Sequence, residues 1–117
     1  TISLAHITFD CHDAAKLAGF WSAAIGRPVD DGAAPFFSSI GFPAEPGQQA
    51  WLFLQVPEGK SAKNRMHLDL TATDRDAEVT RLVGLGATEV DQHDEYGHQW
   101  TVMRDPEGNE FCVASAG

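Results

Sequence analysis

The sequence contains few cysteines, few basic residues and no long apolar run, and each shortage excludes a class of protein. Two cysteines, Cys11 and Cys112, are too few for a disulfide framework and favour free thiols in the cytoplasm. Eight Lys and Arg residues against seventeen Asp and Glu residues give a net charge of −9, which excludes a basic surface for nucleic acid or an anionic membrane. The apolar runs are far too short to span a bilayer. No leader-like segment precedes Ile2, which also favours a cytoplasmic protein.

What the chain does contain is ordinary globular composition and an internal duplication. With 117 residues, 43% of them hydrophobic, it is expected to form one domain over residues 1–117. The segment AHITFD at 5–10 resembles MHLDLT at 66–71, so that His6 and His67 stand 61 positions apart. Asp13 and Asp74 follow at the same separation. Two copies of one supersecondary unit are therefore predicted.

Each copy has the pattern of a βαβββ module. Apolar and polar residues alternate through 5–11 and 66–72, as in strands with one buried face. Apolar residues at helical spacing follow Asp13 and Asp74, which suit helix N-caps, and glycines at 26 and 86 suit helix ends. Further strands are predicted at 28–30, 36–40, 51–56, 88–92, 98–104 and 110–114. The sequence thus predicts eight strands and two helices.

The polar face of the two first strands is the candidate site. The apolar face of each strand should pack against its helix, which leaves side chains of the opposite face free to line a shared concavity. These side chains are His6, Thr8 and Asp10 in the first copy, and His67, Asp69 and Thr71 in the second. The alternative is a simply solvated sheet face.

A turn motif adds a family resemblance. The sequence DPEGN at 105–109, the paired βαβββ pattern and a histidine in each first strand resemble the vicinal oxygen chelate superfamily, and the chain is most similar to its glyoxalase-like domain proteins. The resemblance implies an α+β fold in which two βαβββ modules form a paired, incompletely closed mixed β-barrel with a cavity. Module one would span about 2–58 and module two about 63–115. It also implies a homodimer.

The resemblance further implies a metal site with one ligand from the first and last strands of each module. Carried over by position, the ligands would be His6, Gln55, His67 and Cys112. The family usually has a glutamate where Cys112 stands, four residues after Gly108. A set with Cys112 favours zinc, whereas one with Glu110 in its place suits nickel, zinc, manganese or iron. The alternative is that both histidines are hydrogen-bonded residues of a metal-free pocket.

Catalytic and substrate-binding residues follow from the same polar face. The candidate general bases are Asp10, Asp69 and Glu110, although the motif places none of them. Trp51 and Phe53 share the alternation phase of Gln55 and would line the cavity, with Thr8 and Asp10, or else fill the core. His93 is expected on the surface, and Trp100 in the core or a dimer contact.

Two functions lead, and a pocketed regulatory or partner-binding domain is a third possibility. The first is an enzyme, a metal-dependent lyase, isomerase or oxygenase that acts on a small oxygenated substrate. The second is a metal-free protein that sequesters a small molecule or drug, as bleomycin-resistance proteins do. An acidic cavity with aromatic walls would suit a cationic aromatic ligand.

Overall fold

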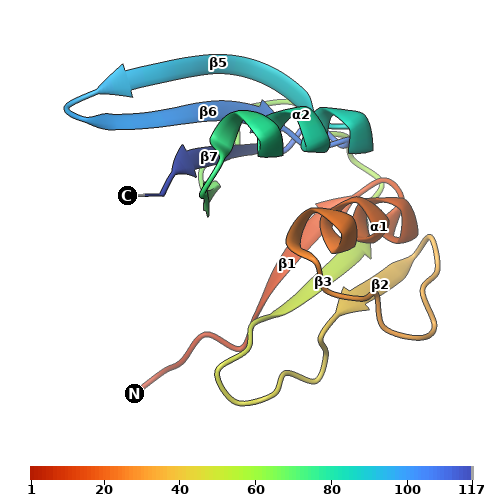
Figure 1. Ribbon diagram of the computed structural model, residues 1–117. Coiled ribbons are helices and arrows are strands. Elements are labelled where there is room, and N and C mark those ends of the chain that lie inside the picture. Colours follow the sequence, from red (N-terminus) through yellow and green to blue (C-terminus); the bar gives the residue numbers. More distant parts are fainter. Residues whose placement is uncertain (117) are drawn as a thin grey trace. The chain divides into compact units, whose positions relative to one another are not determined.

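The computed structural model describes residues 1–116, which form two compact units, Thr1–Gly59 and Lys60–Gly117. The described part contains two helices and seven strands (Figure 1). The first unit holds β1 (His6–Cys11), α1 (Ala14–Ile25), β2 (Phe37–Ile40) and β3 (Ala50–Gln55). The second unit holds β4 (Leu68–Ala72), α2 (Arg75–Leu85), β5 (Thr88–Glu95), β6 (His98–Arg104) and β7 (Glu110–Ser115). Within the described residues, none of the helices has the length and hydrophobicity that crossing a membrane requires.

The first unit is a three-stranded mixed sheet with α1 on one face (Figure 1). Its strand order is β1-β3-β2, with β1 parallel and β2 antiparallel to β3. The Asp13 carboxylate accepts a hydrogen bond from the Lys16 amide at 3.1 Å and so caps the first turn of α1. Gly26 ends the helix at φ 71°, a left-handed conformation that glycine adopts without steric cost.

An aromatic cluster fills the core beneath α1. Phe9 on β1 stacks on Phe53 at 5.2 Å and on Trp51 at 5.8 Å between ring centroids. Trp21 of α1 packs on Trp51 at 5.3 Å and is itself fully buried. Because burying one such side chain stabilises the fold by roughly 1.5–3 kcal/mol, this cluster dominates the stability of the first unit.

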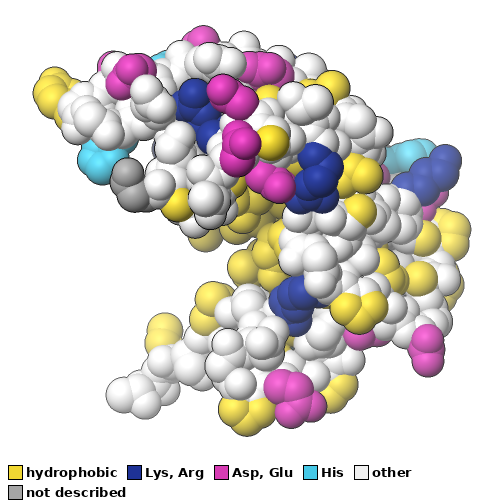
Figure 2. Space-filling model, in the orientation of Figure 1, with side chains coloured by type: hydrophobic (Ala, Val, Ile, Leu, Met, Phe, Trp, Pro, Cys, Tyr) yellow, Lys and Arg dark blue, Asp and Glu magenta, His cyan; other side chains and the backbone are white. Residues whose placement is uncertain are grey.

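The second unit is a four-stranded mixed sheet in the order β4-β7-β6-β5, with α2 on one face (Figure 1). Asp74 caps α2 through a 3.1 Å bond from the Ala77 amide, as Asp13 caps α1. The core under α2 is mostly aliphatic, with Val79 and Leu82 of the helix above Met103 and Val113 of the sheet. Acidic side chains gather over the outer surface of this unit (Figure 2).

The DPEGN motif shapes the turn that delivers β7. The Asp105 carboxylate, only 3% exposed as a residue, accepts from the amides of Glu107 at 2.9 Å and Asn109 at 3.0 Å. The same carboxylate also receives the Asn109 side-chain amide. These bonds fix the path of the chain between β6 and β7, and therefore the direction in which the side chains of β7 point.

The predicted fold class is confirmed, with one strand fewer than expected. Two mixed sheets and two helices form the predicted α+β arrangement of repeated modules. The predicted strand at 28–30 is wrong, since only an isolated bridge between Val29 and Ile40 forms there. Pro28 lacks the amide donor that a strand ladder needs, which explains the loss. The structure divides into two units between Gly59 and Lys60, and the single domain with modules at 2–58 and 63–115 stays a prediction.

Candidate metal centre

The face of the second sheet opposite α2 carries a line of polar side chains. Phe111 and Val113 of β7 are buried in the core under α2, so the intervening Cys112 points to the other face. On β4, Asp69 lies directly opposite Cys112 in the parallel ladder. His67 precedes Asp69 by two positions, and its side chain reaches the same place.

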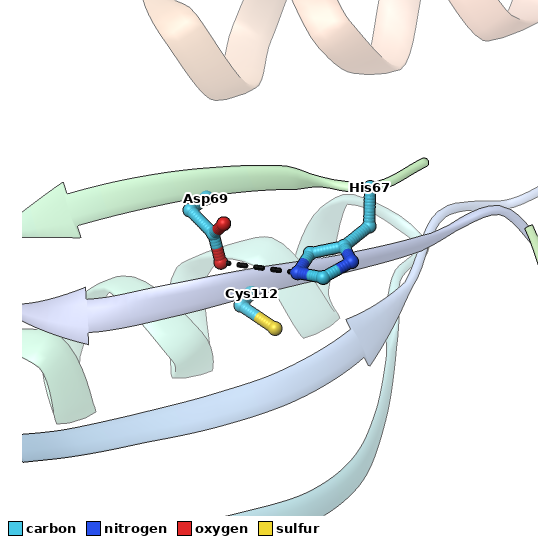
Figure 3. A group of neighbouring side chains, drawn as sticks. All are labelled: His67, Asp69 and Cys112. Atoms are coloured by element: carbon cyan, nitrogen blue, oxygen red, sulfur yellow. Dashed lines mark ion pairs between the residues drawn. The ribbon is translucent and has the colours of Figure 1, made fainter. Parts of the chain in front are cut away.

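These three side chains form a compact group of potential metal ligands. The Nε2 atom of His67 lies 3.3 Å from Oδ1 of Asp69, and the Cys112 sulfur lies beside both, as Figure 3 shows. All three donor atoms lie within 4.8 Å of one another. Cys112 is buried at the base of the group, whereas His67 and Asp69 are exposed. No other such group of three occurs among residues 1–116.

The donor set fits a divalent metal ion. Imidazole nitrogen, carboxylate oxygen and thiolate sulfur are the three ligand types that zinc accepts, at about 2.0–2.3 Å. A donor separation of 3.3 Å is what two ligands of a tetrahedral ion require, and the sulfur lies within 4.8 Å of both donors. Three protein ligands with a fourth position open is the arrangement of catalytic rather than structural zinc.

The thiol of Cys112 is held in its protonated form in the absence of a metal. Burial raises its pKa, and the Asp69 charge and the hydrogen bond to Asp69 raise it further, while Lys63 opposes them weakly. A metal must therefore displace the thiol proton when it binds. This thiol is accordingly not an activated nucleophile on its own.

Glu110 occupies a different place from the one predicted for a catalytic base. It is 9% exposed, and its Oε1 accepts the Asn64 amide at 2.8 Å and lies 3.2 Å from Nζ of Lys60. Nε of Arg104 lies 3.6 Å from the other oxygen. Burial raises the pKa of Glu110, but the bonds from Asn64 and Lys60 outweigh it and lower the pKa overall. The carboxylate therefore anchors the segment 60–64 to β7, which argues against a role as base.

The first unit does not bring its predicted ligands together. His6 and Thr8 lie on the face of β1 opposite α1, and the residue directly opposite Thr8 is Leu52. Gln55 pairs with Cys11 on the α1 face and donates to the His12 carbonyl at 2.8 Å. His6 pairs with Ala50, five residues from Gln55, which corresponds to about 16 Å along a strand. The structure thus contradicts the pairing of His6 and Gln55 as neighbouring ligands within this unit.

Of the two predictions for Trp51 and Phe53, filling of the core is confirmed and lining of the cavity is wrong. Trp51 is 8% exposed and Phe53 is fully buried, both in the cluster with Phe9 beneath α1. Their side chains lie on the same face of β3 as that of Gln55, as predicted. That face packs against α1 and is not the polar face of the sheet. Thr8 and Asp10 are exposed on the opposite face, so these four residues do not form one binding surface in the first unit.

Sequence reasoning missed an aromatic pair on the polar face of the second sheet. Trp100 on β6 and His93 on β5 stack with ring centroids 4.9 Å apart at an angle of 17°. They lie directly opposite each other in the β5–β6 ladder. The available signal was the alternation of β6, in which Trp100 and Val102 share one phase and the buried Thr101 and Met103 the other.

Comparison with known proteins identifies the family of this chain. The model of the glyoxalase-like domain matches residues 6–114. Among curated proteins, none matches the sequence significantly.

Solved structures share the fold at low sequence identity. A glyoxalase/bleomycin resistance protein/dioxygenase family enzyme from Burkholderia phytofirmans PsJN is 18% identical, with 97% of this chain and 98% of that chain covered and a TM-score of 0.78. Fosfomycin resistance protein FosX from Mesorhizobium loti is 14% identical, with coverages of 100% and 94% and a TM-score of 0.73. Lactoylglutathione lyase from Agrobacterium tumefaciens is 18% identical, with coverages of 99% and 95% and a TM-score of 0.66. The family-model match over nearly the whole sequence shows that this chain belongs to the glyoxalase-like domain family, within the vicinal oxygen chelate superfamily.

Proposed function

We propose that this protein is a zinc-dependent enzyme whose metal is held by His67, Asp69 and Cys112. The observation that carries the proposal is the convergence of three different donor atoms within 4.8 Å on two paired strands. A structure of FosX from Listeria monocytogenes holds Mn(II) and 1S,2S-dihydroxypropylphosphonic acid, which supports metal-assisted binding of a small oxygenated molecule in this fold. The sulfur donor of this chain favours zinc over manganese, because thiolates prefer softer ions.

The donor set also bears on the type of reaction. Zinc has no redox chemistry and acts by polarising a bound oxygen. A lyase or isomerase reaction on a small oxygenated substrate therefore fits this site better than an oxygenase reaction.

Asp69 has two roles that experiment can separate. It lies 3.3 Å from His67 and is 69% exposed, so it is placed either as a ligand or as a general base beside the ligands. If Asp69 is a ligand, Asp69→Asn weakens zinc binding. Normal zinc binding with loss of turnover would contradict its place among the ligands and assign it the role of base.

Zinc titration of the full chain tests the proposal. We expect one zinc ion per chain by competition with a chelating dye, and roughly a 100-fold or greater loss of affinity in His67→Ala and in Cys112→Ser. His12→Ala, which removes a histidine of the first unit outside the predicted set, is the control and should bind as the parent does. His6→Ala tests whether the first unit donates a ligand, as the family resemblance implies. Protein that is purified without metal and gains no thermal stability from zinc would contradict the proposal.

The pH dependence of zinc affinity provides a second test. Because the raised pKa keeps the Cys112 thiol protonated at neutral pH, binding releases a proton. Affinity should then rise about tenfold per pH unit between roughly pH 7 and 8, because one thiol proton is released for each zinc ion bound. In Cys112→Ser this dependence should be nearly absent.

The alternative function is metal-free sequestration of a small molecule. The first unit has an open groove of about 520 Å³ whose walls include Arg27, Asp30, Phe42 and Gln48. An acidic chain would favour a cationic ligand there. A panel of cationic glycopeptides should raise the melting temperature if this function holds, and no shift in the panel counts against it.

A homodimer in the cytoplasm completes the proposal. The family resemblance supports association of two chains, and the two free cysteines suit a reducing compartment. Light scattering after size exclusion tests the dimer, and a monomeric mass at micromolar concentration would contradict it.

A further inference from the structure

The polar face of the second sheet continues from the metal centre to the stacked aromatic pair. In the antiparallel ladder between β6 and β7, Val102 lies opposite Cys112 and Trp100 lies opposite Ala114. Residues two apart on a strand share a face, so Trp100 is on the same face as Cys112. The ladder to β5 then places His93 opposite Trp100.

The stack fixes the orientation of the indole ring. His93 covers one side of Trp100 at 4.9 Å, and its Nε2 lies 3.5 Å from Oδ2 of Asp91, which lies two residues away on the same strand. On the other side, the opposing residue on β7 is Ala114, whose methyl group is too small to cover an indole. Trp100 remains half-buried, so a fixed ring with part of its surface accessible stands on this face.

The spacing between ring and metal centre suits one small molecule. Trp100 and Cys112 are diagonal neighbours across the β6–β7 ladder, a relation that puts Cβ atoms about 7–8 Å apart and within reach of aromatic side chains. A ligand with metal-binding oxygens at one end and a planar ring at the other spans such a distance.

The charge of this face restricts the ring further. Asp69 and Asp91 stand at either end of the row that contains Cys112 and Val102. Of the nearby cations, Lys60 and Arg104 are paired with the buried Glu110, and Lys63 acts on Cys112 only weakly, since the pKa of that thiol stays raised. Asp91, beside the stack, disfavours an anionic ring, while a neutral or cationic ring gains from the indole face.

We propose that Trp100, braced by His93, is the stacking platform that selects substrates with a planar, uncharged or cationic aromatic ring attached to the metal-binding oxygens. This inference rests on the proposed function, because the oxygens are taken to bind zinc at His67, Asp69 and Cys112. It moves the aromatic binding surface from the buried Trp51 and Phe53 to the hairpin formed by β5 and β6, which extends beyond α2 (Figure 1).

Matched hydroxamates test the platform on the zinc-loaded full chain. Acetohydroxamate and benzohydroxamate share one metal-binding group and differ in the ring. By calorimetry, we expect the aromatic compound to bind about tenfold more tightly to the parent protein. Trp100→Ala should reduce this ratio to about twofold or less, whereas Trp100→Phe should keep most of it. Tyr96→Asn, which removes the fully exposed aromatic ring at the tip of the same hairpin, should leave it unchanged.

Two outcomes of this comparison would overturn the inference. One is an equal affinity of both hydroxamates for the zinc-loaded parent. The other is an undiminished ratio in Trp100→Ala. A ring with a para-trimethylammonium group should also bind more tightly than one with a para-carboxylate, and the reverse order would overturn the charge selection.

A metal-free measurement separates the platform from the zinc site. N-methylquinolinium is titrated into the apo protein while the indole N–H signals of the three tryptophans are followed by NMR. The signal of Trp100, assigned from its absence in Trp100→Phe, should shift most, because Trp21 and Trp51 are buried. If zinc fails to bind but this shift appears, the proposed function fails and the platform stands. Absence of the shift up to millimolar probe would overturn the platform even if zinc binds.

Discussion

In the first unit, β1 sets polar side chains opposite apolar ones on β3, and Thr8 faces Leu52. In the second unit, the corresponding strands β4 and β7 set Asp69 opposite Cys112. Helix, cap and strand pairing are the same in both, and each has a histidine two residues before the paired position. The two strand pairs have the same backbone arrangement. Two side chains therefore decide whether the sheet face carries a cluster of metal-ligand donors.

The hydrophobic cores also differ, and here the first unit has the larger side chains. Phe53 lies in an aromatic cluster under α1, whereas Val113, at the matching position of the second unit, lies among aliphatic side chains under α2. The second unit therefore has less apolar area to bury per residue and relies more on fixed polar contacts, such as those of Asp105 and Glu110. The first unit has the larger buried side chains, and the second unit has the cluster of potential metal ligands.

The largest expected effect comes from breaking the aromatic core. Phe53→Ala should lower the free energy of unfolding by about 3–5 kcal/mol, because the cavity left beneath α1 has rigid aromatic walls. Val113→Ala, the matched change in the second unit, removes fewer buried atoms and should cost roughly 2 kcal/mol. Urea denaturation followed by circular dichroism measures both. Equal losses would show that the aromatic cluster is not the dominant core.

Transplanting the donors should sharpen the comparison. In a His67→Ala background, which disables the centre of the second unit, Thr8→Asp with Leu52→Cys recreates the donor pattern beside His6. We expect zinc binding with Kd on the order of 10 µM, against none measurable in the background alone. Calorimetric titration checks this, with Thr8→Asp alone as control. No gain in binding would mean that the donor pattern needs further features of the second unit.

The anchor at Glu110 has no counterpart in the first unit, where Ala50 occupies the matching position. Glu110→Gln should cost about 2 kcal/mol at pH 7, since Lys60 and Arg104 lose a buried anionic partner. The folded-state pKa of Glu110 lies below its ordinary value of 4.5, so its stabilisation is present above that pH and is lost as the pH falls through the lowered pKa. The difference between parent and variant should therefore vanish in acid.

Denaturation at pH 7 and pH 3 tests this anchor. Glu58→Gln, an exposed glutamate of the first unit, is the control and should change stability by less than about 0.5 kcal/mol at either pH. A difference for Glu110→Gln that persists unchanged at pH 3 would contradict the charge-based explanation.

The sequence predicted most of the fold because its local signals agree with one another. Alternation in β1 and β4, the caps at Asp13 and Asp74 and the glycine ends all act over a few residues, and all are observed. The strand at 28–30 did not form because Pro28, at its start, lacks the amide donor that a strand ladder needs.

The candidate site was only partly predictable, since register and facing depend on long-range pairing. The alternation of β3 is visible in the sequence, but which phase faces α1 is decided by the fit of Phe9 and Trp21 against Trp51. Gln55 and Trp51 therefore lie on the α1 face of the sheet, opposite to the face on which they were expected. In β7, by contrast, the turn at 105–109 fixes the direction of the side chains, and Cys112 lies beside His67, the two being members of the ligand set that the family resemblance implied.

The smallest expected effect concerns the feature in which the units are most alike. Asp13 and Asp74 each accept one amide of the first helical turn at 3.1 Å, and Asp13→Ala or Asp74→Ala should each cost about 1 kcal/mol. The helices themselves differ, since α2 carries Asp76 and Glu78 in its first turn and α1 has no acidic residue there. These carboxylates already interact with the helix dipole, so at low salt the loss in Asp74→Ala should be a few tenths of a kcal/mol smaller. Thermal denaturation at low and high salt checks this. If the gap between the two variants does not narrow with salt, the difference lies in packing of the caps rather than in the dipole.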